Sequence, residues 1–200
     1  LMKKWFIPII VIAVIAFGIY RWAVGFNNQA VGLEADAKTA WSNVESAYQR
    51  RNDLIGNLVK TVQGAADFER ETLTQMIEAR AKATATNIDV TQLTAENMAQ
   101  FQQAQAGLSG ALSKLLLVVE RYPDLKANQN FLSLQSQLEG TENRINVARD
   151  SYNETVNTYD IQIRTFPNKI LAGWFGFSAM ERYKSDPGSE NAPEVNFDFN

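Results

Sequence analysis

The side chains of this chain that could do chemistry are carboxylates, lysines, arginines and tyrosines, because the sequence contains no histidine and no cysteine. This composition excludes Ser-His-Asp and Cys-His triads, zinc sites built from His or Cys, disulfides and thiol redox chemistry. Paired carboxylates occur at Glu69 with Glu71 and at Glu139 with Glu142. Acid–base catalysis by such a pair needs a cleft, whereas on a helix surface these are ordinary solvated charges. We therefore predict no enzymatic activity, no cofactor and no metal site.

The composition is that of a packed protein without a nucleic-acid-binding face. Of the 200 residues, 46% are hydrophobic and 10% are aromatic, which is enough to build a core. The formal net charge of −3 leaves no basic excess, so we expect no nucleic-acid partner.

An apolar segment near the N-terminus predicts a membrane anchor. Sixteen residues from Trp5 to Tyr20 carry no charge. Counting past Arg21 to Val24 extends the segment to 20 residues, a helix of about 30 Å that spans the hydrocarbon core. A cleaved signal peptide is the alternative, but the bulky residues around Arg21 offer no small-residue cleavage site. The predicted anchor side chains, with aromatic rings at both ends, are Trp5, Phe6, Ile9, Val11, Ile15, Phe17, Tyr20 and Trp22.

The charges that flank this segment favour one orientation. Lys3 and Lys4 precede it, whereas Arg21 and Lys38 follow it. The positive-inside rule then favours a cytoplasmic N-terminus and an exported body. Removing Lys3, Lys4 and Arg21 from the 19 basic residues leaves 16 against 22 acidic residues, a net charge of −6. An acidic body gains no electrostatic help in lying on anionic lipid.

Beyond residue 26 the hydrophobic spacing predicts helices almost throughout. Apolar residues recur every three or four positions, with one interruption at Arg51. Pro123 and Pro167 end two of the segments, and residues 87–94 are expected to form a loop. The predicted helices span residues 33–65, 67–83, 98–122 and 131–166. Short connections favour antiparallel neighbours, so the predicted fold is all-α, with an N-terminal transmembrane helix continuing into an elongated antiparallel four-helix bundle.

Three strings of residues are long enough to be specific. Residues 48–59 read YQRRNDLIGNLV, residues 120–128 read ERYPDLKAN and residues 138–145 read LEGTENRI. Together with the pair Phe166-Pro167, they resemble the signatures of the bacterial LemA family. The sequence departs from the family at Gly56, where Pro is usual, and at residues 67–68, where a His-Glu pair is frequent.

The resemblance implies a short anchor in the bacterial cytoplasmic membrane and an elongated helical bundle without established enzymatic activity. It also implies association with a TPM-domain membrane protein or a membrane zinc metalloprotease. We expect a non-enzymatic, single-pass scaffold or adaptor that binds the lipid bilayer and serves homo-oligomerisation or a membrane partner.

The alternative is an auxiliary hydrolase or a ligand sensor with a carboxylate-lined site. A sensor cavity would depend on Gly107, Gly110 and Gly140, which we interpret instead as places where helices approach closely.

Arg51 occupies a position where its helical neighbours are apolar. A buried guanidinium is costly without a carboxylate partner, and Glu139 and Glu142 are the candidates on the facing helix. The cluster could fix the register of the bundle, form a solvated pair, or bind a ligand or partner.

Residues 167–178 carry more apolar side chains than the bundle needs. They could dock onto the bilayer or a neighbouring subunit, or fold back onto the base of the bundle. The residues concerned are Ile170, Leu171, Trp174, Phe175 and Phe177.

The expected organisation is an anchor at residues 1–26, the bundle at 27–184 and a flexible tail at 185–200. The tail is polar, and disorder is one interpretation. Its last residues alternate Val195, Phe197 and Phe199, which is the pattern of a strand that docks on a partner sheet.

Overall fold

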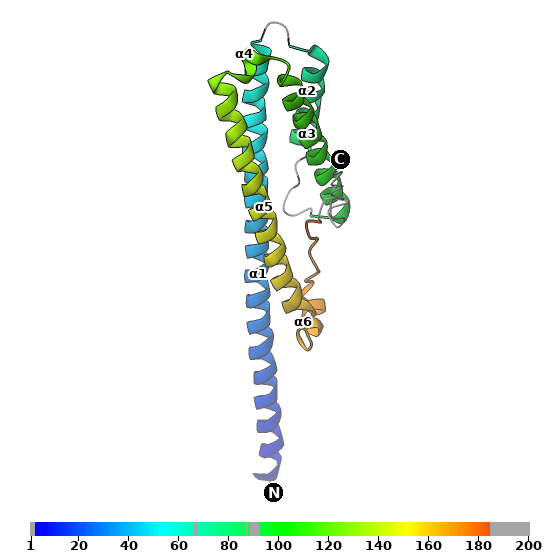
Figure 1. Ribbon diagram of the computed structural model, residues 1–200. Helices are drawn as coiled ribbons and strands as arrows, with labels where there is room; N and C mark the ends of the chain where they lie inside the picture. The colour runs from blue at the N-terminus through cyan, green and yellow to red at the C-terminus, as the bar shows by residue number, and fades with distance from the viewer. Residues whose placement is uncertain (1–2, 66–67, 87, 89–92, 185–200) are drawn as a thin grey trace, which may run out of the picture.

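The computed structural model describes residues 3–65, 68–86, 88 and 93–184, and every regular element in these ranges is a helix (Figure 1). An all-α chain with one long apolar N-terminal helix is therefore confirmed. The predicted tail, residues 185–200, and most of the expected loop lie outside the described residues. The helices are α1 (Lys3–Gln63), α2 (Arg70–Ala85), α3 (Ala95–Val119), α4 (Pro123–Lys126), α5 (Gln129–Arg164) and α6 (Asn168–Phe175).

Helix α1 is a single helix of 61 residues, about 90 Å long at 1.5 Å per residue. Residues 5–20 of α1 carry no charge on any face, whereas from Phe26 onward one stripe of the helix is buried. This stripe, in steps of three or four, includes Phe26, Ala30, Ala37, Trp41, Val44, Tyr48, Ile55, Leu58 and Val62. The buried stripe therefore begins at Phe26, about two helical turns before residue 33, where the spacing predicted that it would start.

Helix α5 returns antiparallel along α1, and the shorter helices α2 and α3 lie side by side next to the far half of α1 (Figure 1). At that far end, all four of these helices contribute buried side chains to one core, including Leu58, Met76, Leu115 and Leu138. A middle core joins the rings of Trp41, Phe101 and Tyr152. A third core lies at the end next to the apolar segment, here called the membrane end, and is built by α1, α5, α6 and two residues that follow α6, Phe177 and Met180.

Two helix ends differ from the sequence-based prediction. Helix α3 ends at Val119, and Pro123 begins the short helix α4, a position that suits proline because its missing N–H is not needed there. Helix α5 begins after Asn128, whose Oδ1 accepts hydrogen bonds from the backbone N–H groups of Asn130 and Phe131. It ends at Arg164, so the prediction that this helix extends to residue 166 is wrong, and the side chain of Phe166, which continues the helical spacing, is 80% exposed.

The glycines do not mark close helix contacts where we expected them. At Gly107, Gly110 and Gly140, no described atom of another element lies within 4 Å of where a Cβ would stand. The close approach is instead at Gly56, where a Cβ would lie 2.9 Å from Nη2 of Arg80. The Arg80 Nε–H donates to the backbone oxygen of Asn52 at 3.0 Å. Glycine at position 56 therefore gives the α2 arginine room to reach the backbone of α1.

Candidate functional site

The anchor is the first functional surface. In the part of the chain that the structure describes, one helix is long and apolar enough to cross a membrane, and none of its most hydrophobic window is buried. The side chains of Phe6, Ile9, Val11, Ile15, Phe17 and Tyr20 are all more than half exposed, and Trp22 is 36% exposed. The side chain of Trp5 lies outside the described residues. A core helix of a soluble protein would be covered by other elements, so the exposure of this apolar segment of α1 is in keeping with a membrane anchor.

One side of helix α6 packs against α1 and α5 at the membrane end of the rod. Leu171 and Ala172 are buried, and they pack with residues of α1 and α5. The rings of Phe175 and Phe177 lie 6.4 and 6.0 Å from the ring of Phe26. Gly176 ends the helix with a φ of 78°, a left-handed conformation that glycine adopts without strain. The chain can therefore reverse its direction at this point.

The outer side of α6 is uncovered by described residues. Ile170 is 50% exposed and Trp174 is 80% exposed, and Phe175, although it contacts Phe26, is 47% exposed. The five predicted contact residues therefore fall into two groups. Leu171 and Phe177 face the rod, whereas Ile170 and Trp174 face outward. Phe175 contacts the rod and is also partly exposed.

After α6 the chain runs back along α5 as a strap, defined as residues 177–184. The Tyr159 hydroxyl donates to the backbone oxygen of Ser178 at 3.0 Å, and the Tyr152 hydroxyl donates to that of Glu181 at 2.6 Å. Asn153 exchanges two hydrogen bonds with the backbone of Tyr183, at 2.8 and 2.9 Å. Sequence reasoning missed this strap, although the tyrosines at buried positions were a usable signal, because a buried hydroxyl needs a partner.

Burial governs the ionisation of these tyrosines. It raises the pKa of Tyr159 to about 12, with the charges of Glu34 and Asp160 adding to the effect. Burial also raises the pKa of Tyr152, again with nearby carboxylates contributing. The hydroxyls therefore remain protonated donors to the strap over the physiological pH range.

The end of the strap is tied to α1 through a buried polar cluster of Tyr48, Arg149 and Tyr183. The two hydroxyls lie 2.8 Å apart, and Arg149 Nε donates to the Tyr48 oxygen at 2.9 Å. The Arg149 guanidinium also lies 4.2 Å from the centre of the Tyr183 ring, which is a cation–π distance. Burial raises the pKa of Tyr48 even though the positive charge of Arg149 opposes the shift.

Arg51 is buried at the level where α1, α3 and α5 meet. Its side chain is 5% exposed, and Nη1 lies 3.3 Å from Oε2 of the half-exposed Glu142. Nη2 donates to the hydroxyl of Ser109 on α3, a partner that sequence reasoning did not identify. Glu139, the other candidate, is exposed and accepts a hydrogen bond from Gln135 on its own helix at 3.4 Å. The structure thus brings Arg51 together with Glu142 and leaves Glu139 apart.

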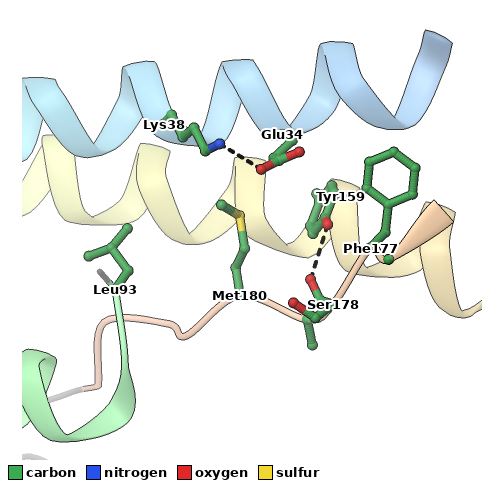
Figure 2. A pocket seen from close by; sticks show the side chains of 9 residues that line it. Glu34, Lys38, Leu93, Tyr159, Phe177, Ser178 and Met180 are labelled. Carbon is green, nitrogen blue, oxygen red and sulfur yellow. Dashed lines mark hydrogen bonds and ion pairs between the residues drawn. The ribbon is translucent and has the colours of Figure 1, made fainter. Parts of the chain in front are cut away.

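Two of the hollows along the described part of the rod bear on the predicted ligand site. One, of about 250 Å³, is bounded by α1, α5 and the strap (Figure 2). Its one carboxylate, Glu34, is paired with Lys38 at 2.6 Å. The other, of about 50 Å³, is lined partly by Asn52 and Gln105. Their carbonyl oxygens Oδ1 and Oε1 are buried without a hydrogen-bond partner among the described residues.

The carboxylates do not gather into a site within the described ranges. No group of three or more Asp or Glu residues there could hold a metal ion. Glu69 pairs with Arg121 at 2.7 Å, and Glu71 accepts from Gln75 on the same helix. The surfaces that the described residues present are an apolar helix, exposed aromatic side chains at the same end of the rod, and long helical faces. The predicted tail residues Val195, Phe197 and Phe199 lie outside the described part of the chain.

Comparisons with known proteins agree with the sequence signatures. The sequence pattern of the LemA family matches residues 40–197. Magnetosome protein MamQ 2 of Paramagnetospirillum magneticum is 27% identical over 180 residues, which cover 82% of this chain and 66% of that protein. MamQ of Magnetospirillum gryphiswaldense is 26% identical over the same coverage. Protein LemA of Metamycoplasma hominis is 25% identical over 160 residues, covering 80% of this chain and 69% of that protein. The match thus spans about two thirds of the length of these relatives.

Proposed function

This chain belongs to the LemA family, and on that premise we propose that it is a non-enzymatic, single-pass membrane scaffold. Its antiparallel four-helix rod would present long helical faces for self-assembly or for a membrane partner. The observation that carries this proposal is the continuity of α1, which runs from Lys3 to Gln63 as one helix.

Continuity matters because it joins the anchor to the rod without a hinge. Val24 belongs to the exposed apolar segment, and Phe26, two residues later, is buried between α5 and α6. Any tilt or rotation of the membrane segment is therefore transmitted to the rod. Such rigid coupling suits a protein that holds a partner at a fixed height and angle above the bilayer.

We propose that the N-terminus is cytoplasmic and that the rod lies on the extracytoplasmic side of the cytoplasmic membrane. Lys3 and Lys4 on one side of the segment, against Arg21 on the other, support this orientation through the positive-inside rule. The partner would be a second copy, a TPM-domain protein or a membrane metalloprotease. Identical anchors that insert in parallel favour copies of the chain, because every rod then presents the same face at the same height.

Sizing of the membrane-extracted protein tests the proposal. The full chain, expressed at its native level, is solubilised in mild detergent and weighed by mass photometry, and co-eluting proteins are identified by mass spectrometry. A discrete particle made of this chain alone supports self-assembly. A defined particle with a second membrane protein supports an adaptor. A monomer without any co-eluting protein, at every expression level tried, overturns the scaffold proposal.

A further inference from the structure

The membrane end of the rod carries an exposed surface that is both aromatic and cationic. Phe166 and Trp174 are each 80% exposed, and Ile170 is 50% exposed. Ile170 and Trp174 are four residues apart on α6 and therefore share one face of the helix. Lys169 precedes Ile170 directly and is also exposed. We call Phe166, Lys169, Ile170 and Trp174, together with Arg164, the collar.

The height of the collar is fixed by contacts to α1. The ring of Phe175, next to Trp174, is stacked on the ring of Phe26. Phe26 follows Val24 by two residues, a rise of about 3 Å along a helix. Because α1 is unbroken here, the collar lies close to the level where the predicted apolar span ends.

The charges of this end contrast with those of the rest of the rod. Residues 5–33 and 161–180 contain no aspartate or glutamate but include Arg21, Arg164 and Lys169. All three side chains are exposed. The chain beyond the apolar span has a net charge of −6, whereas the charged side chains in these two ranges are all positive. A surface of this kind complements anionic phospholipid headgroups.

We propose that the collar is a second membrane contact, which docks at the headgroup–acyl boundary of a bilayer containing anionic phospholipid and fixes the angle of the rod. Tryptophan and phenylalanine rings partition into this boundary, and neighbouring lysine and arginine side chains reach its phosphates. A second copy is a poorer occupant, because copies packed through the collar would bring their Arg164 and Lys169 cations together. The inference rests on the proposed function only in requiring that α1 is the anchor.

A fluorescent label on α6 tests this contact in the full chain. The sequence has no cysteine, so Gly173→Cys gives a single attachment point, and a Cβ there meets no described atom within 4 Å. The labelled protein is reconstituted into phosphatidylcholine vesicles with or without phosphatidylglycerol. Lipids with a shallow spin label serve as quenchers for the labels on α6 and α3, and lipids with a spin label near the end of the acyl chain serve for the Val14 label, which lies about 15 Å from either boundary. Leu117→Cys, 73% exposed on α3, is the matched control far from the membrane, and Val14→Cys reports on the anchor itself.

Docking predicts that the Gly173 label is quenched and blue-shifted, more strongly with phosphatidylglycerol, while the Leu117 label is not. Adding Arg164→Gln and Lys169→Gln should abolish the response to phosphatidylglycerol. Adding Trp174→Ser should abolish quenching in both lipids. An unquenched Gly173 label beside a quenched Val14 label overturns the collar and leaves the anchor intact, whereas two unquenched labels refute the anchor. Quenching that changes as the protein is diluted in lipid shows that a second copy, not lipid, occupies the surface.

Discussion

The two ends of the rod are completed in different ways. At the far end, α1, α2, α3 and α5 together bury a core that includes Leu58 and Leu115, both fully inaccessible. At the membrane end α2 and α3 do not take part, and α1 and α5 are covered by the eight-residue helix α6 and the strap. Phe166 and Trp174 therefore remain exposed there. The difference shows that four helices share a common core at one end, whereas at the other a short helix and a strap leave two aromatic side chains uncovered by described residues.

The largest difference in the free energy of unfolding is expected between the replacement of a buried leucine at the far end and that of an exposed aromatic residue at the membrane end. Leu58→Ala removes a fully buried side chain and should lower the free energy of unfolding by about 2–5 kcal/mol. Trp174→Ala, at an exposed position, should change it by less than about 0.5 kcal/mol. Urea unfolding of the full chain in mild detergent, followed by circular dichroism, measures both. Equal losses would show that the membrane end is packed like the far end.

The buried Arg51 lies between the two ends. We expect the free energy of unfolding to depend more on the charge of the side chain at this position than on its size. Glu142 Oε2 lies 3.3 Å from Nη1 of Arg51, so Arg51→Glu places a buried carboxylate beside Glu142 without a cation and should cost about 3–5 kcal/mol. Arg51→Met fills the same space without charge and leaves Glu142, which is half-exposed, in water. We expect its cost to stay below about 1 kcal/mol. A methionine variant as unstable as the glutamate variant would contradict this, and Glu142→Gln is the matched control.

The membrane end should loosen at high pH before the far end does. An unfolded tyrosine titrates near 10.0, and the pKa of Tyr159 is raised to about 12, with that of Tyr152 raised as well. Because the folded state holds these protons more tightly, their stabilisation is complete below pH 10 and is lost as the pH rises toward 12. Hydrogen exchange of the strap should show this loss. It is measured from about pH 8 to about pH 11, a range on both sides of the unperturbed tyrosine pKa, and is corrected for the intrinsic exchange rate. Exchange independent of pH would disprove the coupling, and Tyr159→Phe should flatten the response.

The smallest effects are expected at the glycines. Gly110→Ala and Gly140→Ala each add a methyl group in open space on a helix and should stabilise the protein by about 0.5–1 kcal/mol. At Gly56 the same change forces the Arg80 guanidinium away and weakens its hydrogen bond to Asn52, so the gain should be smaller or reversed. The midpoints of urea unfolding compare the three variants. A larger gain at Gly56 than at Gly140 would contradict the close approach.

Periodicity predicted which faces are buried, but not which element covers each face. The stripe on α1 and the buried arginine within it were readable from the spacing alone, because each step of three or four returns to one side of a helix. Glu142 was a candidate partner because it adjoins the seam of the facing helix. Ser109 was not, since the register of α3 against α1 depends on contacts between helices.

The membrane end was harder to predict for a different reason. Its structure depends on hydrogen bonds from Tyr152 and Tyr159 to the backbone of a strap that has no periodic pattern of its own. Phe166 continued the helical spacing, yet α5 ends at Arg164 and leaves its ring outside. The glycines at 107, 110 and 140 were misinterpreted because glycine in a helix signals close packing only when a neighbour is present.

Cysteine labelling of α1 in intact cells tests the anchor most directly. Ile12 is 65% exposed in the structure, and Asn28 is exposed beyond the apolar segment, so the folded chain itself covers neither. In single-cysteine variants treated with a membrane-impermeant maleimide, we predict that Asn28→Cys reacts in whole cells and that Ile12→Cys reacts only after the membrane is dissolved. Equal labelling of both positions in intact cells would contradict the anchor, and labelling of Asn28→Cys only in opened cells would contradict the proposed sidedness.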